Sequence, residues 1–338
     1  MKELTRGIAS LRPAERAKAR AHRLSLAPAP ALHPADRAAL ADAGWVIQSV
    51  QRLSGGALHH HWRLRLVQGT EGTRRAQGIK DAEAETLVMR VTASPKLAIS
   101  LSLCVEAKLL DALADQALPV PRPLALLNLP KAGQALLTRY IPGQAKRRLS
   151  VTEGEQLAPQ LAVLAAKVHR ALPPAVLTAY DPLPPLFRAL DPRLAALASR
   201  LDESGLLHPR QQVLLHGDMR TGNYLVQGGR ISGLLDWEFA ALGDPLADIA
   251  WLSLPPWLYG ASNRAGAGLV PMEHFIALYE QASGLRLSRS GLTAWRIAGL
   301  LRWGAIARLQ DARLGLAPDS IEPLSPLLSL AQSWLDSL

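Results

Sequence analysis

Four polar residues between positions 216 and 236 have the types and spacing that phosphoryl transfer requires. His216 and Asp218 follow the apolar run VLL, and Asn223 comes five residues after Asp218. Asp236 directly follows a second apolar run, ISGLL, 13 residues after Asn223. Apolar runs of this length predict short strands, so we expect the polar side chains to emerge at strand ends as one compact cluster.

Two carboxylates and one amide suit a reaction in which the protein mainly positions groups and neutralises charge. Magnesium prefers hard oxygen ligands and usually takes only one or two from protein, a demand that Asn223 and Asp236 meet. Asp218 is then left to accept the proton of an attacking hydroxyl. The alternative is an ordinary loop, in which Asp218 and Asn223 are turn residues and Asp236 caps a strand end.

His216 is the second candidate catalytic residue beside Asp218. Their spacing puts both side chains on one side of an extended segment, and we favour an orienting hydrogen bond from His216 over proton transfer. Glu238 follows Asp236 by two residues. We expect Glu238 to support the site and not to take part in the reaction.

The strings HGDMRTGNYLV and GLLDWEFAALGDPLADIAWL together resemble the signature of the aminoglycoside phosphotransferase family, which is related to choline kinases and more remotely to protein kinases. The resemblance implies a two-lobed, protein-kinase-like α+β fold with a small β-rich lobe and a larger helical lobe. It implies that Asp218 is the catalytic base and that Asn223 and Asp236 hold magnesium. The DWE and GDPLAD strings resemble the bacterial branch that is similar to kinase-like domains linked to acyl-CoA dehydrogenases.

The same resemblance places the nucleotide in the small lobe. Ser54, Gly55 and Gly56 lie between two predicted strands, where family members carry a glycine loop over the phosphates. An ordinary hairpin turn is the alternative. Arg90, in TLVMRVT, is expected to clamp phosphate oxygens, with Glu106 on the following helix as its acidic partner. An exposed surface ion pair is the alternative for this pair.

Two further segments are interpreted by position. The segment LLTRYIPG resembles the hinge between the lobes, where the backbone of Arg139 and Ile141 would pair with adenine. Asp244 precedes Pro245 as a capping residue precedes a first-turn proline, so a helix should start there. Asp248, one turn later, either braces the catalytic loop, as the family implies, or simply favours the helix start.

Alternating apolar residues in WVIQSVQRL, HHWRLRLV and TLVMRVT predict three antiparallel strands. The stretch SLSLCVEAKLLDALA predicts a helix with Cys104 packed in it, and the Pro-rich connection PVPRPLALL leads to a further strand, ALLTRYI. Beyond Gly143, long Leu/Ala-rich amphipathic stretches predict helices. We therefore expect a basic, Pro-containing arm (1–38), a nucleotide-binding lobe (39–140), and a helical lobe with the catalytic loop and substrate cleft (141–338).

The net charge of +10 is uneven, because residues 1–24 hold seven Lys or Arg against two Glu and residues 141–338 hold eighteen against seventeen acidic residues. The second lobe is therefore nearly neutral and selects neither an anionic nor a cationic substrate. No apolar run reaches the roughly 18 residues of a membrane span. The single cysteine cannot form an internal disulfide. We expect a cytoplasmic protein without membrane or nucleic-acid partners, and its oligomeric state is open.

These observations favour a kinase that uses ATP and Mg²⁺ to phosphorylate a hydroxyl of a small molecule. An aminoglycoside kinase is an alternative in the same class, although no Asp/Glu-rich run near the C-terminus offers a cleft for a polycation. A non-catalytic nucleotide-binding protein and a nucleic-acid binder that uses the basic arm are two further hypotheses. Four tryptophans either line an acceptor cleft or form core: Trp251, Trp257, Trp295 and Trp303.

Overall fold

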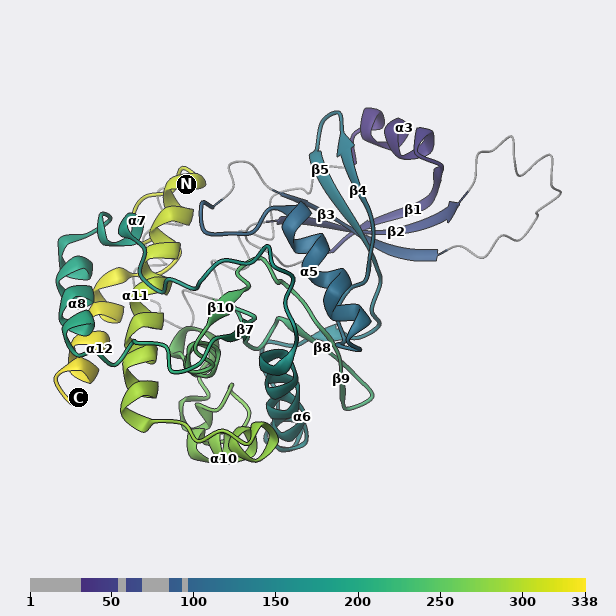
Figure 1. Cartoon of the computed structure of the whole chain (residues 1–338). Helices are drawn as coiled ribbons and strands as arrows, with labels where there is room; N and C mark the ends of the chain where they lie inside the picture. Colours follow the sequence, from purple (N-terminus) through teal and green to yellow (C-terminus); the bar gives the residue numbers. More distant parts are fainter. Residues whose placement is uncertain (1–31, 54–58, 69–84, 93–96) are drawn as a thin grey trace, which may run out of the picture.

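A five-stranded antiparallel sheet forms the smaller of two lobes (Figure 1). The computed structural model describes residues 32–53, 59–68, 85–92 and 97–338. The strands lie in the order β1–β2–β3–β5–β4, with these bounds: β1 (Trp45–Arg52), β2 (His59–Gln68), β3 (Glu85–Thr92), β4 (Pro123–Leu129) and β5 (Gly133–Arg139). The three predicted antiparallel strands are confirmed, because β1 pairs with β2 and β2 pairs with β3.

The two faces of this sheet have different neighbours. Leu64 and Leu66 on β2 and Leu87 and Met89 on β3 are buried in one apolar cluster. Side chains alternate along a strand, so Arg90 points away from the face that carries Met89. Helix α5 (Leu103–Asp115) contacts β4 and β5 on that side and carries the residue that meets Arg90.

Strand β4 was not expected from the sequence. The Pro-rich segment that we interpreted as a connection contains the start of β4 at Pro123. Proline has no N–H to donate, but β4 is an edge strand and Pro123 is its first residue, where proline is tolerated. The interpretation of Cys104 was also wrong, because it lies in α5 with its side chain exposed.

A short helix ties the beginning of the described chain to the small lobe. Helix α3 (Pro34–Asp42) contacts β1 and β4 and buries Leu40. The buried carboxylate of Asp36 accepts the backbone N–H groups of Lys131 and Ala132, at 2.8 and 3.1 Å. The helix runs across the predicted boundary between arm and lobe at residue 38.

Helices dominate the larger lobe, as the amphipathic stretches predict (Figure 1). One apolar core surrounds α6, α9 and α10, and a second lies among α8, α11 and α12. None of the helices in the described ranges is long and apolar enough to cross a membrane. Their bounds are α6 (Val151–Arg170), α7 (Pro185–Arg188), α8 (Pro192–Glu203), α9 (Leu246–Trp251), α10 (Met272–Ser283), α11 (Arg289–Arg313) and α12 (Leu324–Leu335), with 3₁₀ turns η1 (Pro255–Trp257) and η2 (Ser262–Arg264).

Five short strands carry the polar motif. They form the pair β7 (Val213–Leu215) with β10 (Ala241–Gly243) and the sheet β6 (Gln144–Ala145), β8 (Tyr224–Gln227) and β9 (Arg230–Leu234). The strand, loop and strand order predicted around the motif is therefore present. The β8–β9 hairpin is fastened to α6, because the Gln160 amide donates to the carbonyl of Gly229 and accepts the N–H of Ile231.

The start of α6 is fixed by a capping box. The Ser150 hydroxyl accepts the N–H of Glu153, and the Glu153 carboxylate accepts the N–H of Ser150 at 2.9 Å. Lys146 also donates to this carboxylate, at 2.6 Å. The hydrogen bond from Lys146 and those from Ser150 lower the pKa of Glu153 to about 2.

This depressed pKa gives a prediction for stability. A carboxyl group whose folded pKa lies below its unfolded value of 4.5 stabilises the fold above that value and stops doing so as pH falls toward about 2. Glu153→Gln should therefore be less stable than the wild type at neutral pH, and the difference should vanish near pH 2. Urea denaturation across this range measures it. Glu155→Gln is the control, since Glu155 is exposed in the same turn, and an equal effect there would contradict the assignment.

Candidate active site

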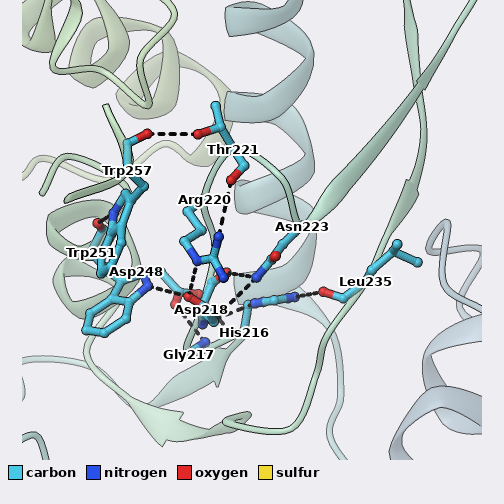
Figure 2. Close-up of polar contacts among 10 residues, drawn as sticks. All are labelled: His216, Gly217, Asp218, Arg220, Thr221, Asn223, Leu235, Asp248, Trp251 and Trp257. Atoms are coloured by element: carbon cyan, nitrogen blue, oxygen red, sulfur yellow. Dashed lines mark hydrogen bonds and ion pairs between the residues drawn. The ribbon is translucent and has the colours of Figure 1, made fainter. Parts of the chain in front are cut away.

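One carboxylate in α9 holds the loop between β7 and β8 in place (Figure 2). Asp248 is 1% exposed and accepts the backbone N–H of His216 at 2.8 Å and that of Gly217 at 2.9 Å. Gly217 has a φ of +78°, and a β-carbon there would stand 2.1 Å from the carbonyl oxygen of Phe239. Only glycine fits this turn, and Asp248 braces the loop as the family resemblance implies.

A buried chain of hydrogen bonds connects Asp248 to helices α6 and α10. His169 of α6 approaches the Asp248 carboxylate with Nε2 at 3.3 Å, and its Nδ1 lies 2.6 Å from the hydroxyl of Tyr279 in α10. Burial alone would raise the pKa of Asp248, but hydrogen bonding and charge from His169 and the N–H of His216 lower it. Asp248 is therefore an ionised acceptor for the loop.

His216 is fully buried and both of its ring nitrogens face the backbone. Its Nε2 donates to the carbonyl of Leu235 at 2.8 Å, and its Nδ1 accepts the N–H of Asp218 at 3.2 Å. Burial lowers the pKa of His216 more than the nearby carboxylates raise it. The neutral ring thus joins the loop to the end of β9, which is the orienting hydrogen bond that the sequence predicts.

Three side chains surround the carboxylate of Asp218 (Figure 2). Its Oδ1 accepts Trp251 Nε1 at 2.7 Å and Arg220 Nε at 2.9 Å. Its Oδ2 accepts the amide nitrogen of Asn223 at 2.6 Å. The Arg220 guanidinium lies 5.7 Å from the ring centroid of Trp257, so this cation is held from two directions.

Asn223 and Asp236 have the donor atoms that a magnesium ion takes from protein. The amide nitrogen of Asn223 donates to both the carbonyl and Oδ2 of Asp218, which leaves its side-chain oxygen as the atom for a cation. Asp236 is half-buried and has a φ of +61°. This left-handed backbone is costly for a residue other than glycine and is typical of functional positions. Both residues therefore fit a magnesium site completed by phosphate oxygens and water.

Arg90 of the small lobe meets two carboxylates. It pairs with Glu106 of α5, as predicted, and its Nη2 lies 3.9 Å from Glu238 of the larger lobe. Burial alone would lower the pKa of Arg90, but Glu106, Asp236 and Glu238 raise it. Burial raises the pKa of Glu238 to about 8, and Arg90 opposes this shift. The pair is buried, so the alternative of an exposed ion pair is wrong.

The predicted hinge follows β5. The N–H of Arg139, the last residue of β5, donates to the carbonyl of Arg122 at 2.9 Å, so this N–H is not open to an adenine ring. Among the described residues the N–H of Ile141 makes no backbone hydrogen bond. The predicted phosphate loop of Ser54, Gly55 and Gly56 lies outside the described residues.

Several residues of the site were missed in the sequence. Arg220 lies in the motif, two residues beyond Asp218, and that spacing was a usable signal. His169 and Tyr279 come from separate helices and belong to no local motif. The tryptophans are mainly core, with Trp251, Trp257 and Trp295 buried, although Trp251 also touches Asp218.

The two-lobed fold, with a carboxylate and amide cluster facing an arginine of the small lobe, defines a kinase-like phosphotransferase. The chain belongs to the phosphotransferase enzyme family (APH), whose sequence model matches residues 49–279. The fold is similar to that of aminoglycoside phosphotransferase APH(4)-Ia in a ternary complex with AMP-PNP and hygromycin B. That structure has a TM-score of 0.60 and 16% identity, and the match covers 90% of this chain and 99% of that one.

Two other relatives are informative. Choline kinase LicA from Streptococcus pneumoniae has a TM-score of 0.57 and 16% identity, with 86% of this chain and 94% of that chain covered. Acyl-CoA dehydrogenase family member 11 of Pongo abelii is 27% identical over 122 residues, which are 33% of this chain and 16% of the relative. The chain therefore matches only a small part of that relative's length.

The brace on the loop can be tested by changing Asp248. Asparagine keeps one oxygen for two N–H donors and places an amide nitrogen beside the other, so Asp248→Asn should lower the free energy of unfolding by about 3 kcal/mol. Urea denaturation measures the change. Asp202→Asn is the control, because Asp202 forms an exposed ion pair with Arg188 and should cost under about 0.5 kcal/mol. Equal effects of the two variants would refute the brace.

Proposed function

We propose that this protein transfers the γ-phosphoryl group of ATP to a hydroxyl of a small molecule, with Asp218 as the base. The proposal rests on one observation, which is that the two carboxylate oxygens of Asp218 accept different numbers of hydrogen bonds. Oδ1 accepts two donors, from Trp251 and Arg220, whereas among the described residues only Asn223 donates to Oδ2. A carboxylate oxygen accepts about two hydrogen bonds, so Oδ2 keeps room for the acceptor's proton.

In the proposed step the acceptor oxygen forms a bond to the γ-phosphorus as the bond between that phosphorus and the bridging oxygen of ADP breaks. The acceptor's proton moves to Oδ2 of Asp218, and the electron pair of the broken bond leaves with ADP. Arg220 and Trp251 fix the plane of the carboxylate. His216 and Asp248 are positioning residues, because they act through the loop backbone.

The nucleotide assignment is supported by the charge arrangement of the small lobe. Arg90 is buried beside Glu106, so its guanidinium has a fixed direction, and its Nε and Nη2 make no hydrogen bond in the described structure. A planar guanidinium with open N–H groups suits phosphate oxygens. The AMP-PNP in the APH(4)-Ia complex is consistent with such use. The backbone of Arg139 and Ile141 and the segment Ser54–Gly56 complete the proposed nucleotide site.

We assign the magnesium ligands to Asn223 and Asp236. When bound, the ion would neutralise negative charge on the phosphates. The chain's own contribution is to aim the Asn223 oxygen, through the two bonds of its amide nitrogen to Asp218. Glu238 lies beside Arg90 and is assigned a supporting role in the site. It is not assigned as a magnesium ligand.

The role of Asp218 is tested by Asp218→Asn. Without the base, turnover should fall by about a thousandfold, while the dissociation constant for ATP stays within about twofold. ADP release measured against a library of hydroxyl compounds, with calorimetry for ATP binding, separates the two effects. Asp202→Asn should leave both quantities unchanged. Full turnover in Asp218→Asn would remove Asp218 from the chemistry.

The magnesium site is tested by Asp236→Asn. In the wild type, ATP should raise the melting temperature more with magnesium than without it, because Asp236 would help to hold the ion when ATP is bound. Asp236→Asn should lose most of this magnesium-dependent increment and keep the increment from ATP alone. Asp181→Asn serves as the control from another loop of the same lobe. An unchanged magnesium increment in Asp236→Asn would show that the ion is held elsewhere.

A further inference from the structure

Two arginines from separate parts of the chain meet over the catalytic loop. Arg220 belongs to the loop, and Arg147 lies in the segment between β6 and α6. Arg147 Cγ and Arg220 Nη1 lie 3.5 and 3.6 Å from the position that a β-carbon would take on Gly222. Gly222 stands between Asp218 and Asn223, so the guanidinium of Arg220 and the side-chain stem of Arg147 both lie beside the loop that carries the proposed base.

The residue that lies beside both arginines is a glycine. Gly222 has a φ of +97°, a left-handed conformation that other residues rarely adopt. Apart from its own chain neighbours, no described atom other than those of Arg147 and Arg220 lies within 4 Å of the missing β-carbon. Because residue 222 is glycine, it has no side chain that would cover the two arginines.

The two cations differ in how they are held. Arg220 is fixed by Asp218 and by the ring of Trp257, and in the described structure its Nη2 makes no hydrogen bond. Arg147 is exposed and forms no ion pair with any described residue. The neighbouring Lys146, in contrast, is neutralised by Glu153. The ion pair with Asp218 balances the charge of Arg220, so the positive charge beside Gly222 that no described carboxylate neutralises is that of Arg147.

We propose that Arg147 and Arg220 form an anion subsite that binds a carboxylate or phosphate group of the acceptor, close to its reacting hydroxyl. The inference rests on the proposed function and names the substrate class: an anionic hydroxyl compound. Guanidinium groups match the planar oxygens of such anions and bind them with charge-assisted hydrogen bonds. A polycationic acceptor such as an aminoglycoside would meet repulsion from Arg147 at the same place.

The subsite is tested with three compounds that share a three-carbon skeleton with two adjacent hydroxyls and differ in net charge. They are glycerate, glycerol and 3-amino-1,2-propanediol. Calorimetry on the whole chain at constant ionic strength should show glycerate binding at least about tenfold more tightly than glycerol, with the amine weakest. Arg147→Gln should bring glycerate close to glycerol. Arg148→Gln is the matched control, because this exposed arginine has no atom within 4 Å of the Gly222 β-carbon position.

ATP binding is measured in each variant, so that the two proposals fail separately. If the three probes bind equally, if glycerate does not bind, or if Arg147→Gln behaves like Arg148→Gln, the anion subsite is overturned even where ATP still binds. If glycerate binds through Arg147 but the wild type binds no ATP, the proposed function fails and the anion site stands. Intact ATP binding in Arg147→Gln also shows that the variant is folded.

Discussion

The rest of the site depends on the hydrogen bonds that Asp248 accepts from two consecutive backbone N–H groups. They fix the turn at His216 and Gly217, at 2.8 and 2.9 Å, before the chain reaches Asp218. An ionised carboxylate in an apolar interior is unfavourable unless its acceptor sites are filled, and here the loop and His169 fill them. The loop depends on the ionised carboxylate of Asp248 to accept its N–H groups. The buried carboxylate in turn depends on these hydrogen bonds to offset the free-energy cost of its desolvation.

The polar groups around Asp218 share one property, which is that hydrogen bonds to neighbouring side chains fix their orientation. The amide nitrogen of Asn223 donates a hydrogen bond to Asp218, and this bond fixes the direction of the amide oxygen. Trp251 occupies one oxygen of Asp218 and thereby directs the other. Arg90 pairs with Glu106 and lies 3.9 Å from Glu238 of the larger lobe. Preorganisation of this kind removes the need for reorientation when charge moves, which is how phosphotransferases lower their barrier.

Much of this was readable in the sequence because the signals are local. Alternating residues located β1 to β3, and the spacing of Asp218, Asn223 and Asp236 located the polar cluster. Signals that depend on distant contacts were not readable. The edge strand β4 was hidden by the proline at its start and by the prolines before it, and nothing local brings Arg147 to Gly222. The nearly neutral charge of residues 141–338 also concealed Arg147, which forms no ion pair with a described residue, because an average over a lobe says nothing about one loop.

Helix α6 fastens both halves of the motif, through Gln160 at the β8–β9 hairpin and through His169 at Asp248. The catalytic loop and the hairpin that leads to Asp236 therefore belong to one cooperative unit with this helix. Their amide hydrogens should exchange with solvent water only in openings that detach α6, and not by local fraying of the loop. The amides of the loop and of α6 should therefore become exposed to solvent in the same opening event.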